Sequence, residues 1–171
     1  MAIYGNGGEY DITCKITAEL KTTTSQFMCV GQAPATTTAA DRTVSLCGVD
    51  NSTGAATGTA FHFIGIVQSS QDSNSEVATV RCFGVSKATC AHSVPAFSYV
   101  MPYWGVSTTT MAGRIIALAD GATMGVTANT GSSHVTIVGR ALESGSTGTV
   151  ISVLINPQMY EYRLLGSTNI V

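Results

Sequence analysis

The chain has 171 residues, of which only 11% are charged, and its formal net charge is -2. Ordinary globular proteins carry about 25% charged residues, so the sequence favours a surface hidden in an assembly, or else one solvated by its many Thr and Ser side chains. No basic stretch could follow a phosphate backbone, no window of about 20 apolar residues could span a bilayer, and no secretory signal opens the chain, which argues against nucleic-acid binding, membrane insertion and export.

The first predicted element is a half-buried strand over Tyr10–Leu20. Apolar residues, among them Tyr10, Ile12 and Ile16, occupy every second position and polar residues fall between them, which is the period of a strand with one wet face. Met1–Glu9 holds three glycines and is expected to be an extended arm. The strand belongs either to the protein's own sheet or to a partner's sheet that it extends.

Short apolar runs between polar, glycine-rich turns predict further strands through the middle of the chain. Within Glu76–Val85 one face holds only small residues, so we expect it to pack closely against a facing sheet. Phe97–Tyr103 reads as a strand interrupted by Pro102, and Arg114–Leu118 is either a strand or one helical turn. The remaining predicted strands are Gln26–Val30, Thr43–Val49, Phe61–Val67 and Met124–Ala128.

The sequence is organised around Val135–Pro157, where two apolar runs flank a turn-rich segment and so predict a β-hairpin. In Thr149–Ile155 both alternating faces are largely apolar, and we expect little of either face to be exposed. Pro157 has no N–H to donate and is expected to end the strand. The tail Gln158–Val171 is too apolar for a disordered end, so it should pack on its own domain or on a partner.

Many short strands without an amphipathic helix predict an all-β fold. We expect a small β-sandwich or barrel of jelly-roll-like form with an extended N-terminal arm. Residues 1–60 would form the arm and accessory strands, residues 61–157 the β-domain, and residues 158–171 a tail that packs on the domain or on a partner.

The chain offers no constellation of residues that predicts an enzyme, a cofactor site or a metal site. Its five cysteines are odd in number and contain no C-x-x-C, so we interpret them as reduced thiols rather than a disulfide framework or a zinc site. His62, His92 and His134 fall in separate segments and are interpreted as structural. No phosphate loop, nucleophile elbow or H-E-x-x-H motif occurs.

The block Phe61–Asn156 carries short motifs in a definite order. G-I-V-Q-S-S precedes a T-V-R-C-F-G-V strand, V-P-A-F follows, and V-G-R-A-L-E then leads through a Gly/Ser/Thr hairpin into V-I-S-V-L. This order resembles the capsid cement, or head decoration, proteins of tailed bacteriophages, in which a V-x-G-x-A-L strand pairs with a V-x-V-x-L strand. The resemblance covers a little over half of the chain. Phe97-Ser98 stands where family members often have Gly-Asp.

The resemblance implies a non-enzymatic β-domain, made in the host cytoplasm and placed on the outer capsid surface of the virion. Its expected partners are the major capsid protein and further copies of itself in a homo-oligomer, with a trimer as the expected state. A phage head fibre or receptor-binding β-domain is the main alternative, and a carbohydrate-binding β-sandwich is the third.

Two sets of side chains are expected at the contacts. The N-terminal segment lies outside the family-like block and suits an anchor, while the stretch around residue 100 is almost free of charge and suits a contact between subunits. The expected capsid interface is Ile3, Tyr4, Tyr10, Ile12 and Ile16, and the expected subunit interface is Phe97, Tyr99, Tyr103 and Trp104.

Overall fold

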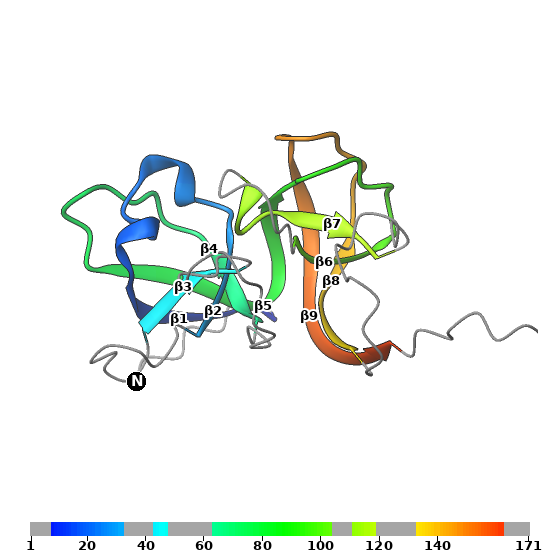
Figure 1. The fold of residues 1–171 in the computed structure, drawn as a ribbon, viewed down its shortest axis with the longest axis horizontal. Coiled ribbons are helices and arrows are strands. Elements are labelled where there is room, and N and C mark those ends of the chain that lie inside the picture. Colours follow the sequence, from blue (N-terminus) through cyan, green and yellow to red (C-terminus); the bar gives the residue numbers. More distant parts are fainter. Residues whose placement is uncertain (1–7, 33–42, 48–62, 104–110, 119–132, 163–171) are drawn as a thin grey trace, which may run out of the picture.

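The computed structural model describes residues 8–32, 43–47, 63–103, 111–118 and 133–162, and β-strands dominate them (Figure 1). Two short 3₁₀ turns, Ala18–Leu20 and Thr23–Ser25, follow the first strand, and these described ranges contain no α-helix. The all-β prediction is therefore confirmed. The strands are β1 (Tyr10–Ile16), β2 (Cys29–Gln32), β3 (Thr43–Leu46), β4 (Phe63–Val67), β5 (Val77–Thr89), β6 (Tyr99–Pro102), β7 (Ile115–Ala117), β8 (Ser133–Ala141) and β9 (Val150–Tyr162).

Five strands close a mixed β-barrel in the order β1-β3-β2-β4-β5, with β5 returning to β1. β1 and β3 run parallel, and the other neighbours in the ring run antiparallel. The alternation predicted for the first strand is confirmed from Tyr10 to Ile16, because Cys14 and Ile16 are buried while Thr13 and Lys15 are exposed. The strand was expected to reach Leu20, and that part is wrong, because Ala18–Leu20 forms a 3₁₀ turn. β1 is thus a strand of the protein's own barrel. The barrel core consists of Cys14, Ile16, Leu20, Val30, Val44, Val67, Ala78 and Val80.

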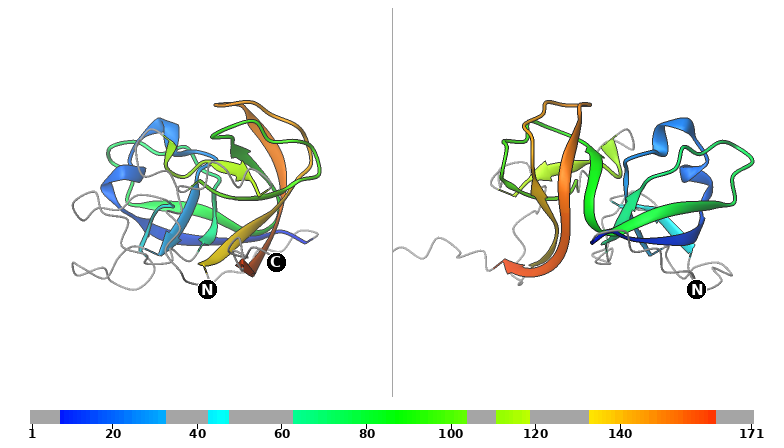
Figure 2. Two further views of the ribbon diagram at one scale, coloured as in Figure 1. Left: turned by 45° about the vertical axis from the view of Figure 1, so that its right-hand side comes forward. Right: turned by 180° about the vertical axis from the view of Figure 1, so that it is seen from behind.

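β5 joins the barrel to the remaining strands, as both views of Figure 2 show. Its first half pairs with β1 and β4, and its second half, from Gly84 to Thr89, pairs with β9. Gly84 has a φ of +99°, and a Cβ there would lie 2.9 Å from the carbonyl oxygen of Gly8. A residue without a side chain suits this backbone and this close approach. Ala78 and Val80 are also buried, so the predicted face of small residues is confirmed.

Four strands pack outside the barrel, in the order β9-β8-β6-β7 counted from β5. A parallel bridge between Cys90 and Ile115 brings β7 back to the end of β5, so this group also curls over a core. That core combines barrel residues such as Ile66 with hairpin residues such as Ile151 and Ile155. Burying each such side chain stabilises the fold by about 1.5–3 kcal/mol, so the hairpin is held firmly against the barrel.

The hairpin predicted at residues 135–157 is present as β8 and β9, but Pro157 does not end it, and that prediction is wrong. β9 continues to Tyr162. The pairing with β8 shifts between Ile137 and Gly139, which marks a β-bulge. A bulge leaves a residue outside the regular hydrogen-bond ladder, so a residue without an N–H is tolerated there. The first residues of the predicted tail therefore belong to a strand.

The expectation that both faces of β9 are covered is also wrong. Ile151, Val153 and Ile155 are at most 1% exposed, whereas Val150 is 41% and Leu154 is 40% exposed. The sequence places apolar residues on both faces of β9, but in the single chain a core covers only one of these faces. The other side is an uncovered apolar sheet face.

The barrel includes strands from both sides of the boundary expected at residue 61. β1, β2 and β3 precede that residue and β4 and β5 follow it, so the N-terminal strands are integral to the barrel. β5 runs beyond the predicted segment Glu76–Val85, as far as Thr89. Residues 115–117 form a strand rather than a helical turn. Residues 1–7 of the expected arm and the strand expected at 124–128 lie outside the described residues.

Candidate interaction surface

One row of side chains crosses the outer face of the sheet formed by β5, β9, β8 and β6. In register, Val85 lies opposite Leu154, and Leu154 lies opposite Arg140. Arg140 in turn lies opposite Tyr99. Directly opposed residues point to the same side of a sheet, so each strand contributes one residue to the row. Val85 is 45%, Leu154 40% and Tyr99 44% exposed, and Arg140 is exposed as well. We call these four residues the outer row.

Two further apolar side chains extend the outer row along its strands. Phe83 lies two positions before Val85 on β5 and is 46% exposed. Val150 lies four positions before Leu154 on β9, and both are exposed. Positions separated by an even number of residues share one face of a strand, so these side chains point to the side of the outer row.

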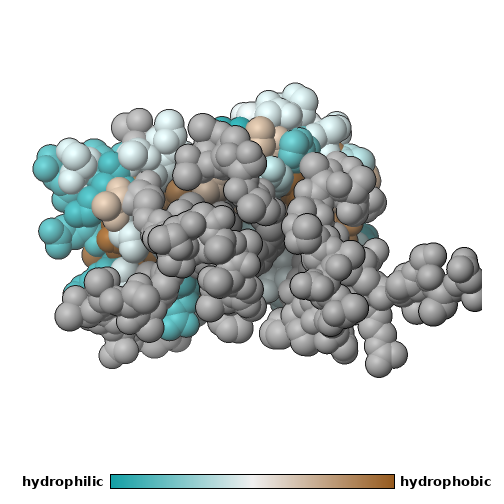
Figure 3. Space-filling model, viewed as in Figure 1, coloured by the Kyte–Doolittle hydropathy of each residue, from teal (hydrophilic) through white to brown (hydrophobic). Residues whose placement is uncertain are grey.

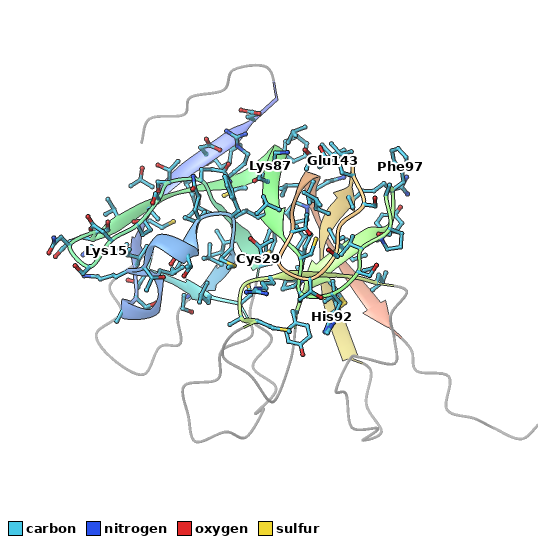
Figure 4. The ribbon with its side chains drawn as sticks, turned by 90° about the horizontal axis from the view of Figure 1, so that it is seen from above. Lys15, Cys29, Lys87, His92, Phe97 and Glu143 are labelled. Atoms are coloured by element: carbon cyan, nitrogen blue, oxygen red, sulfur yellow. The ribbon has the colours of Figure 1, made fainter. Side chains whose placement is uncertain are left out.

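Phe97 lies on the same side of the molecule and is 69% exposed. Figure 4 shows Phe97, Glu143 and Lys87 on one side of the molecule and His92 on the opposite side. The backbone of Phe97 has a φ of 62°, in the left-handed region that residues with a Cβ rarely adopt. Its N–H donates to the carbonyl oxygen of Ala141 at 2.9 Å, which fixes the turn into β6. A large apolar side chain is therefore held outward by a strained turn.

The strained backbone at Phe97 predicts that a glycine variant there is more stable than an alanine variant, the reverse of the order in a regular strand. Phe97→Gly should be more stable than Phe97→Ala by about 1 kcal/mol, because a Cβ in the left-handed region costs roughly 1–2 kcal/mol. At Tyr99, which lies in a regular strand, Tyr99→Gly should instead be less stable than Tyr99→Ala by about 0.5–1 kcal/mol. Urea unfolding of the four variants checks this. If the glycine and alanine variants have the same order of stability at both positions, the backbone of Phe97 is not strained.

A neutral polar group lies next to the outer row, two residues beyond Val85 on β5 and two residues before Leu154 on β9. Lys87 Nζ donates to Ser152 Oγ at 2.8 Å, and Ser152 Oγ donates to Glu143 Oε1 at 2.6 Å. Lys87 Nζ also lies 3.7 Å from that carboxylate oxygen. The hydrogen bonds from Ser152, with a smaller contribution from Lys87, hold the pKa of Glu143 below its usual value. Glu143 therefore stays ionised at neutral pH and balances Lys87.

An acidic cluster lies beside the β5 end of the outer row. Arg81 Nε is 2.8 Å from Asp11 Oδ1, and Arg81 Nη1 is 2.8 Å from Glu9 Oε1. Arg81 Nη1 also donates to the carbonyl oxygen of Val85 at 2.6 Å, so the cluster adjoins the row. The hydrogen bond to Asp11 raises the pKa of Arg81, which stays charged. Two carboxylates against one guanidinium leave this end with a net negative charge.

Arg140 gives the row a positive charge toward β6. Its guanidinium carbon lies 4.5 Å from the centroid of the Tyr99 ring, a cation–π contact that contributes about 0.5–1 kcal/mol at an exposed site. Within the described part of the chain, no carboxylate oxygen lies within 4.0 Å of this guanidinium. The outer row thus runs from a negative end through an apolar centre to a positive end.

The residues expected to face a capsid lie at different depths in the fold. Ile16 is 8% exposed and belongs to the barrel core. Ile12 packs against that core, and Tyr10 lies half-buried opposite Phe83. The inward side of β1 is therefore occupied by the barrel itself. The two other residues of this set, Ile3 and Tyr4, lie outside the described residues.

The residues expected between subunits fall into two groups. Phe97 and Tyr99 are exposed on the side of the outer row. Tyr103 instead packs against a small core of Ala91, Met101 and Ile116, and its ring centroid is 5.3 Å from that of His92. Trp104 lies outside the described residues.

Sequence reasoning missed the aliphatic centre of the surface, Val85 and Leu154, together with Arg140. The sequence did contain a sign of this surface, because apolar residues also occupy positions of β9 that alternate with its buried residues. That pattern is typical of a strand covered on both sides, and the sequence did not reveal that the second cover must come from outside the chain.

All five cysteines lie in the described residues and remain thiols. Burial raises the pKa of Cys47 to about 12 and that of Cys90 to about 11. Burial, with a contribution from Cys47, also raises the pKa of Cys29 well above its usual value. Burial, followed by neighbouring Cys14, raises the pKa of Cys82 to about 11. The thiolate is the reactive form of cysteine, so these groups are poor nucleophiles at neutral pH.

These pKa shifts predict slow alkylation of the folded protein at pH 7. Iodoacetamide should modify all five cysteines quickly in denaturant and at most Cys82, the least buried, in the native state. Intact mass after timed quenching measures both rates, and Cys82→Ser should abolish the native reaction. Rapid native modification at several cysteines, or a non-reduced mass indicating disulfides, would contradict the prediction.

Comparison with known proteins gives no assignment for this surface. No protein-family model matches the chain, and no curated protein matches it. Within the described residues, no group of three His, Cys, Asp or Glu side chains is placed to hold a metal ion. The same residues include no helix long and apolar enough to cross a membrane.

Proposed function

We propose that this protein is a structural virion protein that decorates the outside of a phage capsid and bridges neighbouring major capsid proteins. The observation that supports this best is the exposed apolar face centred on the outer row. Soluble monomers rarely leave a contiguous apolar patch of more than a few hundred Å² open, and such patches mark interaction sites. The resemblance of residues 61–156 to capsid cement proteins supplies the biological setting.

The low charge of the chain supports the same proposal. Only 11% of the residues are charged, and interface cores are depleted in charge. In this proposal the protein is a homo-oligomer on the capsid. The resemblance implies a trimer, whereas a two-fold contact between copies would close as a dimer. The proposal also includes a jelly-roll-like form of the β-domain and an extended N-terminal arm ahead of β1.

Uptake by capsids tests the proposal. Purified protein is mixed with expanded phage heads that lack a decoration protein, and the heads are recovered by sedimentation. We expect saturable uptake at a fixed number of copies per head. The same heads before expansion are the control for non-specific adsorption and should take up less.

The main alternative, a head fibre or receptor-binding β-domain, predicts a different result. The exposed pair of Tyr99 and Arg140 offers an aromatic face and a charge that a receptor could use. In that case the protein would bind host cells and would not load onto heads in a fixed ratio. Host-cell binding together with no saturable uptake would overturn the decoration proposal.

A further inference from the structure

We infer that a second copy of this chain docks on the outer row, with the two copies related by a two-fold axis through its apolar centre. The inference rests on the proposed function, since it names one occupant of the same assembly surface. Three observations carry it: the area that is exposed, the distribution of charge along the row, and the apolar pattern of β9.

The exposed area matches one half of a standard interface. Six apolar side chains on this side are between 40% and 69% exposed. Together they offer on the order of 500 Å² of accessible surface, taking the sizes usual for such residues. A standard interface buries about 800 Å² per partner, somewhat more than half of it apolar. The six are Phe83, Val85, Phe97, Tyr99, Val150 and Leu154.

The charges of the row are complementary to those of the same row turned by half a rotation. One end holds Glu9 and Asp11 against a single guanidinium, and the other end holds Arg140 without a carboxylate among the described residues. A two-fold axis between Val85 and Leu154 sets the positive end of each copy over the negative end of the other. An isologous interface requires this self-complementarity.

The pattern of β9 supports the same occupant. Its inner face packs in the protein's own core, and Val150 and Leu154 on its outer face would be covered by an apposed sheet. Two sheets pack face to face at about 10 Å through their apolar residues. In the view from behind in Figure 2, β9 and the second half of β5 lie side by side with no other described strand across them.

Matched substitutions on β5 test the inference in solution. Val85→Lys places a charge at the centre of the row, and Val77→Lys makes the same change at an equally exposed valine far along the strand. By sedimentation velocity, wild type and Val77→Lys should form a species of twice the mass of the Val85→Lys species. We expect the Kd of the pairing to rise at least about tenfold in Val85→Lys. Circular dichroism of both variants checks that they fold.

A charge reversal tests how the copies are oriented. Arg140→Glu should weaken the pairing at low salt, because like charges then face each other, and added salt should reduce the loss. Adding Glu9→Arg in the same chain should restore the pairing. Failure of the double variant to recover any affinity would overturn the two-fold arrangement.

Several results would overturn the inference as a whole. Equal mass of wild type and Val85→Lys up to roughly 100 μM would remove the second copy from the row. Weakening of the pairing by Val77→Lys to the same extent as by Val85→Lys would do the same. Pairing that appears only after removal of residues 163–171 would identify the chain's own end as the occupant.

The capsid assay separates this inference from the proposed function. If wild type does not pair and Val85→Lys loses uptake by heads, a capsid protein occupies the row, the decoration proposal stands and the second copy is excluded. If wild type pairs but heads take up neither protein, the inference stands and the decoration proposal fails.

Discussion

Gly139→Ala is expected to destabilise the fold by about 3 kcal/mol or more, the upper end of what overpacking costs. Gly139 lies in β8 between β9 and β6, opposite Ile155 and Val100. A Cβ at this position would overlap the carbonyl oxygen of Leu154 and lie 3.0 Å from the backbone nitrogen of Asn156. Backbone atoms of a paired strand cannot move aside without breaking the ladder. Urea unfolding measures the change against a total stability of about 5–15 kcal/mol.

Gly148→Ala is the matched control for Gly139→Ala. Gly148 also has a positive φ, +78°, but a Cβ there would meet no atom within 4 Å. Its cost should therefore be the conformational penalty alone, about 1–2 kcal/mol. Equal losses at the two glycines would mean that the backbones of β8 and β9 do not approach each other as described.

Ile155→Ala is expected to cost about 2–4 kcal/mol, whereas Leu154→Ala on the same strand should cost less than about 1 kcal/mol. Ile155 is fully buried in the core between the hairpin and the barrel, and truncation leaves a cavity. Leu154 is 40% exposed, so its truncation removes little buried surface from the single chain. Chemical unfolding at low protein concentration, where copies do not pair, makes the comparison.

The contrast between these neighbours checks the one-sided burial of β9. A loss at Leu154 as large as that at Ile155 would show that the outer face is covered within the chain. In that case the outer row would not be an open surface, and a second copy could not dock on it.

Local patterns predicted most of the strands. The alternation from Tyr10 to Ile16 placed β1 and its buried face, and the small residues of β5 predicted a closely packed face. Both features depend on the period of two that a strand imposes on its side chains. Phe97 and Tyr99 were predicted at a contact and lie on the exposed side of the sheet.

Local sequence patterns could not predict how the strands come together in the fold. The closure of the barrel depends on the pairing of β1 with β5, about 65 residues apart in sequence, and on the parallel pairing of β1 with β3. The bulge that accommodates Pro157 is set by the register between β8 and β9 rather than by the proline. Periodicity also cannot say whether an apolar face is covered by its own chain or by a partner, which is why Val85 and Leu154 were missed.

A density map of this protein bound to expanded phage heads tests whether another chain covers the outer row. We expect the outer face of β5, β9, β8 and β6 to be covered by another chain, with density against Val85, Leu154 and Tyr99. We also expect the polar barrel end, visible as the hydrophilic region of Figure 3, to be less covered. A map in which every copy turns the outer row to solvent would contradict the account.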